Sequence, residues 1–401
     1  MNDDMDPESG SGFRYVPIFT TVLWLIIFVI TPFSLLQAQE APPKKADVQI
    51  GLENGFIIQA PDTSVSLRIG FRFQEQFSSV YNPDENNTNS EFQVRRFRLI
   101  FAGHAFDGRF TWFLMPSFDR GNPSLEIVRV RWQLAKNSWI YGGQINQPGT
   151  REFMETSGSL QFVDRSTTDR LFRLGYDAGL GFKQKMYPGN SALIGIATIT
   201  NGEGQNQRAA EGGLSYTGRL EYYPFGEFNM LIGTDFERSE KPKLAIAGAF
   251  NLNQDARRTR SQNGPFLIDA SEDIYVYFLE TSLRYRGFSF HSAFVNRNAD
   301  DNLLNDGIPQ NIIFEGYAYY FEAGYLLSDE WEVVSRFEQI FPEKELRANI
   351  NEQRSMLIGI NKFFLRHRLK IQADLAYDTE FHPVLEDADF LTFRTQFQIE
   401  F

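Results

Sequence analysis

Apolar and polar residues alternate in many short stretches of this chain. In the stretch LTFRTQFQIEF (391–401), the odd positions carry Leu, Phe, Thr, Phe, Ile and Phe, whereas the even positions from 394 onward carry Arg, Gln, Gln and Glu. Successive side chains of a β-strand point to opposite faces, so this pattern predicts a strand with one apolar and one polar face. A helix would need a period of 3.6 residues, which these stretches lack.

The number of such stretches predicts a large barrel. One run starts at residue 66, and turn signals separate it from further runs at 92–106, 109–119, 124–135, 138–146, 176–187, 191–201, 213–224, 242–253, 272–286, 288–298, 316–327, 331–341, 353–366, 368–380 and 389–401. A short run at 228–236 is either a further strand or part of a turn. Single-chain bacterial barrels close with an even number of strands, so we expect about 16. Strands of about 9–11 residues can cross a bilayer at a barrel's tilt.

The composition favours a transmembrane antiparallel β-barrel, an all-β fold. Aromatic residues make up 15% of the chain and charged residues 22%. Tyr and Phe recur at the ends of the runs, where a membrane barrel carries its aromatic girdles. A soluble β-sandwich is the alternative. Phe401 closes the last amphipathic run, as in the C-terminal signal that barrel-assembly machinery recognises. We therefore expect the protein to lie in the outer membrane of a Gram-negative bacterium. Its expected partners are the lipid of that membrane and the barrel-assembly machinery.

The chain begins with a segment that predicts export. Residues 16–36 form an uncharged apolar run, and a small residue, Ala38, precedes a polar stretch. We interpret 1–38 as a signal peptide, although the residues before the apolar run are acidic and Arg14 is their only basic residue. A retained membrane anchor is the alternative. The predicted organisation is then a periplasmic linker at 39–60 and a barrel at 61–401.

Several functional classes find no support in the sequence. Cysteine is absent and only four histidines are present, so we expect no disulfide, metal site or cofactor. His291 lies close to Ser289 and Ser292, but neighbours in one strand cannot form a catalytic triad, so no catalytic residue is predicted and we expect no enzyme. The net charge of −12 does not suggest a nucleic-acid partner.

Five segments resemble the phosphate-selective porin O and P family. They are VRRFRLIFAG (94–103), DGRFTWFLMPSFD (107–119), GGQINQP (142–148), FVDRS (162–166) and LGYDAGLGF (174–182). Their order and spacing match that family from about residue 54 onward, most clearly over 90–185. The resemblance implies a 16-stranded general or anion-preferring porin that forms a homotrimer. It also implies that 147–175 folds into the lumen as a constriction loop.

A pore needs a narrow point lined with chosen charges. If the apolar alternates face lipid, six strand arginines face inward: Arg68, Arg72, Arg96, Arg98, Arg129 and Arg131. The loop 147–175 adds four arginines and four acids: Arg151, Arg165, Arg170 and Arg173, with Glu152, Glu155, Asp164 and Asp169. Arginine binds carboxylate and phosphate oxygens through a fixed fork and stays charged. These ten arginines are the predicted pore-lining and anion-binding residues.

The sequence allows several hypotheses about the role of these arginines. They could bias the lumen toward anions, or they could pair with the loop acids and fix the loop to the wall. A specific phosphate site is a third reading, which the lack of lysine in the loop disfavours. We expect passive diffusion of small hydrophilic or anionic solutes. The alternative is a structural or gated barrel without constitutive conductance, with a gate or binding surface in external loops 254–271 and 299–315.

Overall fold

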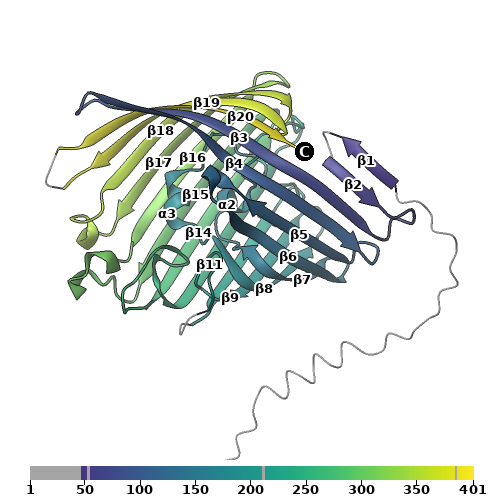
Figure 1. The fold of residues 1–401 in the computed structure, drawn as a ribbon, viewed down its shortest axis with the longest axis horizontal. Helices are drawn as coiled ribbons and strands as arrows, with labels where there is room; N and C mark the ends of the chain where they lie inside the picture. The colour runs from purple at the N-terminus through teal and green to yellow at the C-terminus, as the bar shows by residue number, and fades with distance from the viewer. Residues whose placement is uncertain (1–46, 52–54, 210–212, 384–385) are drawn as a thin grey trace, which may run out of the picture. The chain divides into compact units, whose positions relative to one another are not determined.

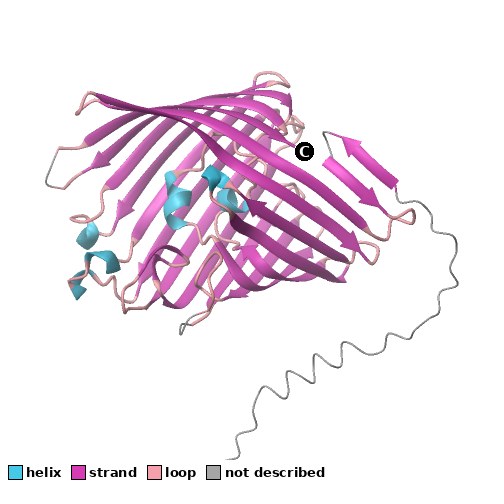
Figure 2. Cartoon of the chain, in the orientation of Figure 1, coloured by secondary structure: helices cyan, strands magenta, loops and turns pink. Residues whose placement is uncertain are grey.

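Antiparallel strands dominate the structure, a computed structural model that describes residues 47–51, 55–209, 213–383 and 386–401 (Figure 1, Figure 2). Within these residues, sixteen strands form a closed barrel, which confirms the predicted fold and strand number. They are β3 (Ser66–Asn82), β4 (Asn87–Ala105), β5 (Phe110–Ser117), β6 (Ser124–Ala135), β7 (Ser138–Asn146), β8 (Tyr176–Met186), β9 (Ala192–Thr200), β10 (Ser215–Tyr223), β11 (Lys243–Ala256), β14 (Glu272–Tyr285), β15 (Phe288–Ala299), β16 (Gly316–Leu326), β17 (Trp331–Pro342), β18 (Glu352–Leu365), β19 (Leu369–Phe381) and β20 (Ala388–Glu400).

The first and last strands close the barrel. β20 pairs with β3 from Leu391 opposite Tyr81 to Glu400 opposite Arg72. Phe401 continues this pairing, because its carbonyl accepts from the Phe71 N–H at 2.8 Å and its own N–H donates to the Phe71 carbonyl at 3.0 Å. Their rings meet edge to face. The pairing satisfies backbone groups that would otherwise form two open sheet edges.

The start of β3 extends beyond β20 and carries an additional hairpin. β2 (Gly55–Gln59) pairs with β3 from Phe56 opposite Ile69 to Gln59 opposite Ser66, and β1 (Asp47–Gly51) pairs with β2. The sequence predicted a linker over these residues, so the structure differs here. The alternating apolar residues of both segments suit a sheet, and β3 offers an unpaired edge where β20 has ended.

The inward and outward positions follow the predicted alternation. On β16, for example, Tyr317, Phe321 and Tyr325 are exposed on the outside, whereas Ala318 and Tyr320 are buried inside. Large exposed apolar side chains recur in this way on most strands, which gives the outer surface an apolar belt. Such a surface suits lipid and would be a liability in water.

The two ends of the barrel differ in their connections. One end, the short-turn end, holds Phe401 and tight turns such as 106–109, where Phe106, Asp107 and Gly108 all have positive φ. The opposite end, the long-loop end, holds the connections 147–175, 257–271 and 300–315. These connections contain β12 (Arg258–Arg260), β13 (Asn263–Phe266), η2 (Leu304–Asp306) and η3 (Pro309–Asn311), while η1 (Asp119–Gly121) and η4 (Lys344–Leu346) lie in shorter ones.

The short-turn end has one exception, the long connection 224–242 between β10 and β11. The sequence left 228–236 open between a strand and a turn, and the structure shows turns and irregular backbone there. The predicted signal peptide and its alternative, a retained anchor, lie outside the described residues. No helix within the described residues is long and apolar enough to span a membrane.

Candidate permeation path

The loop 147–175 contains two short helices with side-chain caps. In α2 (Arg151–Met154) the Thr150 hydroxyl accepts from the Phe153 N–H at 3.2 Å. In α3 (Thr167–Phe172) the Ser166 hydroxyl accepts from the Asp169 N–H at 2.9 Å. Such caps satisfy backbone donors at the first turn. Both helices can therefore form inside a barrel, where few waters would replace those hydrogen bonds.

Hydrogen bonds place this loop inside the lumen. It leaves the wall between β7 and β8, yet its backbone N–H groups donate to inward carboxylates of distant strands. The bonds run from Arg151 to Glu280 of β14 at 2.6 Å, from Thr168 to Glu338 of β17 at 2.8 Å, and from Val163 to Asp374 of β19 at 3.0 Å. The loop thus crosses the barrel interior, as the sequence predicted from the family resemblance.

One side of the lumen is filled with protein, and we call the inward faces of β9–β16 the packed side. Near the long-loop end, Phe172 and Leu174 of the loop pack with a large set of buried apolar residues, namely Ala249, Ala256, Leu267, Ile274, Val276, Phe278, Val295, Leu303, Ile313, Phe314, Ala318 and Ile340. Nearer the short-turn end, Met230 from connection 224–242 packs with Tyr223 and with Ile194 and Ile196 of β9. No sequence pattern had predicted that this connection folds inward.

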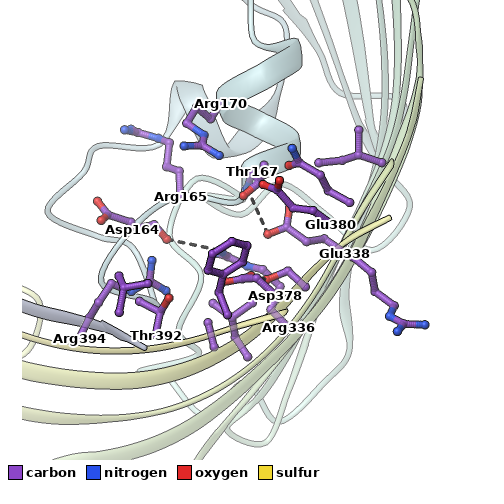
Figure 3. Close-up of a pocket in the computed structure, with 18 of the residues that line it drawn as sticks. Asp164, Arg165, Thr167, Arg170, Arg336, Glu338, Asp378, Glu380, Thr392 and Arg394 are labelled. Atoms are coloured by element: carbon purple, nitrogen blue, oxygen red, sulfur yellow. Dashed lines mark hydrogen bonds between the residues drawn. The ribbon is translucent and has the colours of Figure 1, made fainter. Parts of the chain in front are cut away.

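The other side of the lumen, formed by β17–β20 and β3–β8, keeps open space, and we call it the open side. One cavity on this side is a vestibule of about 580 Å³ at the long-loop end. Nine arginines line it against four carboxylates: Arg95, Arg96, Arg120, Arg165, Arg170, Arg173, Arg336, Arg354 and Arg394, with Asp164, Glu338, Asp378 and Glu380. Figure 3 shows that Arg165 and Arg170 reach it from the loop, and Arg336 and Arg394 from the wall.

Two smaller cavities share lining residues with the vestibule or with each other. A neck of about 200 Å³ shares Arg95, Arg96, Arg165 and Arg173 with the vestibule. A chamber of about 270 Å³ shares Arg98, Phe153, Arg165 and Tyr176 with the neck. Arg165 lines all three spaces. The shared residues make the three arginine-lined cavities neighbours on the open side, and we call them together the candidate permeation path.

A β-bulge adds one arginine to this path. In β4, Arg96 lies opposite Gln74 but Val94 lies opposite Glu75, so Arg95 is an extra residue in the pairing. Strict alternation would point Arg95 toward lipid, where a charge is unfavourable. Because the bulge re-aims the chain, Arg95 and Arg96 both face inward and both bond to Asp164 of the loop, at 2.9 and 3.3 Å.

The predicted strand arginines occupy different surroundings. Arg96 and Arg98 line the neck, and Arg68, Arg72 and Arg98 line the chamber. Arg72 bonds to Glu400 at 2.6 Å, and Arg98 bonds to Asp119 at 2.6 Å. Arg68 differs from them, since its Nε is buried without a hydrogen-bond partner among the described residues.

Three predicted arginines do not line the vestibule, neck or chamber. Arg129 lies over the ring of Phe113, and Arg131 bonds to Thr111 and lies over Trp139. Arg151 is buried and pairs with Glu155 of the same helix at 2.7 Å. The predicted loop arginines Arg165, Arg170 and Arg173 all line the vestibule.

The hypothesis that wall arginines pair with the loop acids and fix the loop to the wall holds for part of the site. Asp164 bonds to wall arginines, and Glu152 accepts from Arg336 of β17 at 3.1 Å. Glu155 and Asp169 instead have arginine partners within the loop itself. Five further vestibule arginines were not predicted from the sequence: Arg95, Arg120, Arg336, Arg354 and Arg394. The alternation of β17 and β20 contained the signal for Arg336 and Arg394, since both lie at inward positions, whereas Arg354 has the parity of the exposed residues of β18.

Two loop carboxyls have opposite electrostatics. Burial of the Asp164 carboxyl would raise its pKa, but Arg95, Arg96 and Arg394 outweigh that effect and hold the pKa well below the usual range. Burial raises the pKa of Glu155 to about 7, against the opposing effect of Arg151. Asp164 is therefore ionised at neutral pH, whereas Glu155 is divided between its two forms.

The external loops 257–271 and 300–315 contact each other. The Phe314 N–H donates to the Thr259 carbonyl at 3.0 Å, and the Asn311 side chain bonds to both backbone groups of Ile268. These contacts use backbone and amide groups. Together with Leu267, Leu303, Ile313 and Phe314, which belong to the buried apolar set, they cover the packed side at the long-loop end.

Comparison with known proteins agrees with this architecture. The sequence profile of the phosphate-selective porin O and P family matches residues 67–401. No curated protein sequence matches the chain. Among solved structures, the outer membrane channel DcaP of Acinetobacter baumannii is 8% identical with a TM-score of 0.56, and the match covers 86% of this chain and 99% of that one.

Two further solved structures share the fold. OprB of Pseudomonas putida is 8% identical with a TM-score of 0.55, over 84% of this chain and 94% of that one. An anion-selective porin from Comamonas acidovorans is 8% identical with a TM-score of 0.53, over 84% of this chain and 100% of that one. The chain belongs to the phosphate-selective porin O and P family and is a porin of the Gram-negative outer membrane, through which small hydrophilic solutes diffuse passively.

Proposed function

We propose that this porin prefers anions and that it acts as a pore without catalysis. The observation that carries the proposal is the lining of the three cavities on the open side, in which arginines outnumber carboxylates by nine to four in the vestibule alone. Clefts lined by one sign of charge concentrate ions of the opposite sign. Chloride, phosphate and organic anions are the solutes that this lining favours over cations.

Arg165 is the residue that we propose to matter most for selectivity. It lines all three cavities, and it is held by hydrogen bonds to the Glu152 and Glu155 carbonyls at 2.8 and 2.7 Å. Among the described residues, its one carboxylate partner is Asp169, with an oxygen 3.9 Å from the Arg165 Nε, so its charge is only weakly compensated. In water, a unit charge about 5 Å from a passing ion changes its energy by roughly 0.8 kcal/mol, which corresponds to about fourfold in relative permeability.

The test is the reversal potential of purified protein in a planar bilayer under a KCl gradient. We expect a reversal potential whose sign shows that chloride is more permeable than potassium. Arg165→Gln should lower the ratio of chloride to potassium permeability by about fourfold. Arg286→Gln is the matched control, because Arg286 is an exposed residue in the β14–β15 turn and lines none of the three cavities. A conducting but unselective wild type would contradict the proposal, and absent conductance would favour a structural or gated barrel.

We also propose a homotrimer that associates through the outer faces of β3–β5. β5 pairs with β4 only between Ala105 and Arg98, so the longer strand has an uncovered edge toward the long-loop end. Beside it lies an outer groove of about 740 Å³, whose apolar lining residues are Phe73, Val94, Phe97 and Phe118. The outward residues Phe110, Trp112 and Leu114 extend this apolar face. Lipid would cover the remaining outer belt.

An unheated gel series tests the trimer. Phe118→Ala should lower the temperature at which trimers dissociate, because Phe118 lies in the groove. Phe321→Ala removes an exposed outward phenyl group from β16, outside the groove, and should leave that temperature unchanged. Equal effects of both substitutions would show that the groove has no special role in association.

We propose that residues 1–38 are cleaved after export and that Phe401 is the signal for the barrel-assembly machinery. In the folded barrel the Phe401 ring packs on Phe71, and its backbone is paired. Phe401→Ala should reduce the amount of barrel in the outer membrane. Refolding of the same variant into detergent should proceed as in the wild type if the residue acts as a signal, and a matching refolding defect would indicate a structural role alone.

A further inference from the structure

The chamber differs from the vestibule in the chemistry of its wall. Inward side chains of β4, β5 and β6 contribute Ile100, Phe113, Met115 and Ile127 to it, and α2 contributes Phe153 and Met154. Charged groups line the same space: Arg68, Arg72, Arg98 and Arg165, with Glu155 and Glu400. The chamber is thus apolar along β4–β6 and α2, and its charged lining has four arginines against two carboxylates.

These apolar residues enclose a space that they do not fill. Protein interiors are normally close-packed, so apolar groups that served only to attach α2 to the wall would meet without a gap. Here about 270 Å³ remains between α2 and the strands. An apolar cavity of about 150 Å³ is enough to hold benzene in an engineered protein. The chamber therefore has room for a small ring together with a charged group.

The charged groups point to an anionic end on that ring. Arg72 is occupied by Glu400 and by hydroxyls of the loop, and Arg98 is occupied by Asp119 and Glu126. Arg68 has a buried Nε without a partner among the described residues. A ligand cannot reach this buried Nε, but the two terminal nitrogens of the Arg68 guanidinium can bind a carboxylate in the chamber through two parallel hydrogen bonds.

We propose that the chamber is a binding site for amphiphilic carboxylates, in particular small aromatic acids, with the carboxylate on Arg68 and the ring against Met115 and Ile127. This inference rests on the proposed anion preference and adds a solute class to it. A purely inorganic anion would leave the apolar walls unsatisfied, since they offer no hydrogen bond. A neutral aromatic compound would form no ionic bond with the arginines, and a cation would be repelled by them.

The experiment measures how sodium benzoate and sodium acetate reduce the chloride current of single wild-type channels. Both anions carry one carboxylate, so the difference between them reports the ring. We expect benzoate to half-block the current at a concentration about tenfold lower than acetate, as apolar pockets discriminate by such factors. Equal half-blocking concentrations would overturn the proposal.

Two substitutions from different walls locate the site. Met115→Gln keeps the side-chain length and should remove most of the benzoate advantage, while Arg68→Gln should raise the half-blocking concentration of benzoate by about tenfold. Met186→Gln and Arg286→Gln are the controls, because both residues are exposed at the short-turn end and line none of the cavities. A benzoate advantage that survives both chamber substitutions would also overturn the proposal.

Two further readouts make each result interpretable. The heat-dependent gel mobility of each variant reports whether the barrel has folded, and inward positions of a barrel tolerate polar side chains. The reversal potential in KCl reports the anion preference independently of benzoate. A chloride-selective wild type with no benzoate advantage would reject the chamber site alone, whereas an unselective wild type would reject the proposed function.

Discussion

The packed side and the open side of this barrel use the same strand geometry for opposite purposes. On the packed side, inward positions hold small and branched apolar residues, and buried arginines bond to carboxylates or to backbone carbonyls, as Arg219 bonds to Glu280 and Arg297 bonds to the Leu171 carbonyl. On the open side, the loop packs on the wall through Phe162, but arginines line open space beside it, and Arg68 and Arg354 have no ion pair among the described residues. We therefore expect stability to depend mainly on the packed side and selectivity mainly on the open side.

The comparison predicts that the largest energetic effect lies in a buried ion pair of the packed side. Arg219 bonds to Glu280 at 2.7 Å and to the Gly149 carbonyl at 2.6 Å, so it fixes the start of the loop. Removing one partner of a buried pair costs about 3–5 kcal/mol, because the other charge stays buried. Arg219→Ala should lower the free energy of unfolding in urea by this amount and make the single-channel current noisier. A variant with wild-type stability and wild-type current noise would show that other contacts hold the loop in place.

A second prediction concerns the connection 224–242. Met230 is buried to 2% exposure against Tyr223 and Ile194, so Met230→Ala should destabilise the barrel by about 2–5 kcal/mol. Met186→Ala is the matched control, since Met186 is 47% exposed and its loss should cost less than about 0.5 kcal/mol. Urea titrations followed by gel mobility measure both. If the two variants unfold alike, connection 224–242 contributes nothing to the packed side.

The open side should show the reverse behaviour. Arg354 lies over the ring of Phe381 at the vestibule wall and has no hydrogen-bond partner among the described residues. Arg354→Gln should change the free energy of unfolding by less than about 0.5 kcal/mol. It should nevertheless reduce the chloride preference measured by reversal potential. A stability loss comparable to that of Arg219→Ala would remove the distinction between the two sides.

The smallest expected effect is a dependence on pH. Burial raises the pKa of Glu155 to about 7 in the folded barrel, with Arg151, Arg165, Glu152 and Glu322 around it. The stability gained from its protonated form is present below the pKa of an ordinary glutamate and is lost as the pH rises through about 7. Ionisation also adds a negative charge to the chamber, so the chloride preference should fall between about pH 5.5 and about pH 8.5.

Glu155→Gln tests this dependence, because the amide keeps the shape of the protonated side chain and does not titrate. We expect its reversal potential to stay constant over the same pH range. A wild type whose reversal potential does not change with pH, or a variant that changes as the wild type does, would exclude Glu155 as the titrating group.

Sequence periodicity predicted the strands closely because inward and outward environments differ strongly in polarity at almost every position. It located β17 at 331–341, and the structure has Trp331–Pro342. Periodicity fails where the backbone leaves strict pairing. Arg95 faces inward only because of the bulge opposite Gln74 and Glu75, and no local sequence pattern in β4 predicts that bulge.

The loop and the inward connection were harder to predict for a related reason. The partners of Arg151 and Val163 are carboxylates more than a hundred residues away, Glu280 and Asp374. Such contacts depend on the three-dimensional course of the loop, whereas its charge count of four against four is neutral and uninformative. For the same reason, the sequence predicted that Arg129 and Arg131 face inward, but it could not predict that the three cavities are lined by other arginines.

The closing seam between β3 and β20 has a kinetic consequence. Its partners, such as Arg72 and Glu400, are separated by almost the whole barrel sequence, so the last ladder forms only after every intervening hairpin is in place. Topologies dominated by such distant pairing fold slowly, since the entropy of joining the ends is lost before the contacts are gained. Until that moment two long unsatisfied edges are available to neighbouring chains, which makes the nearly complete intermediate the species most prone to aggregate.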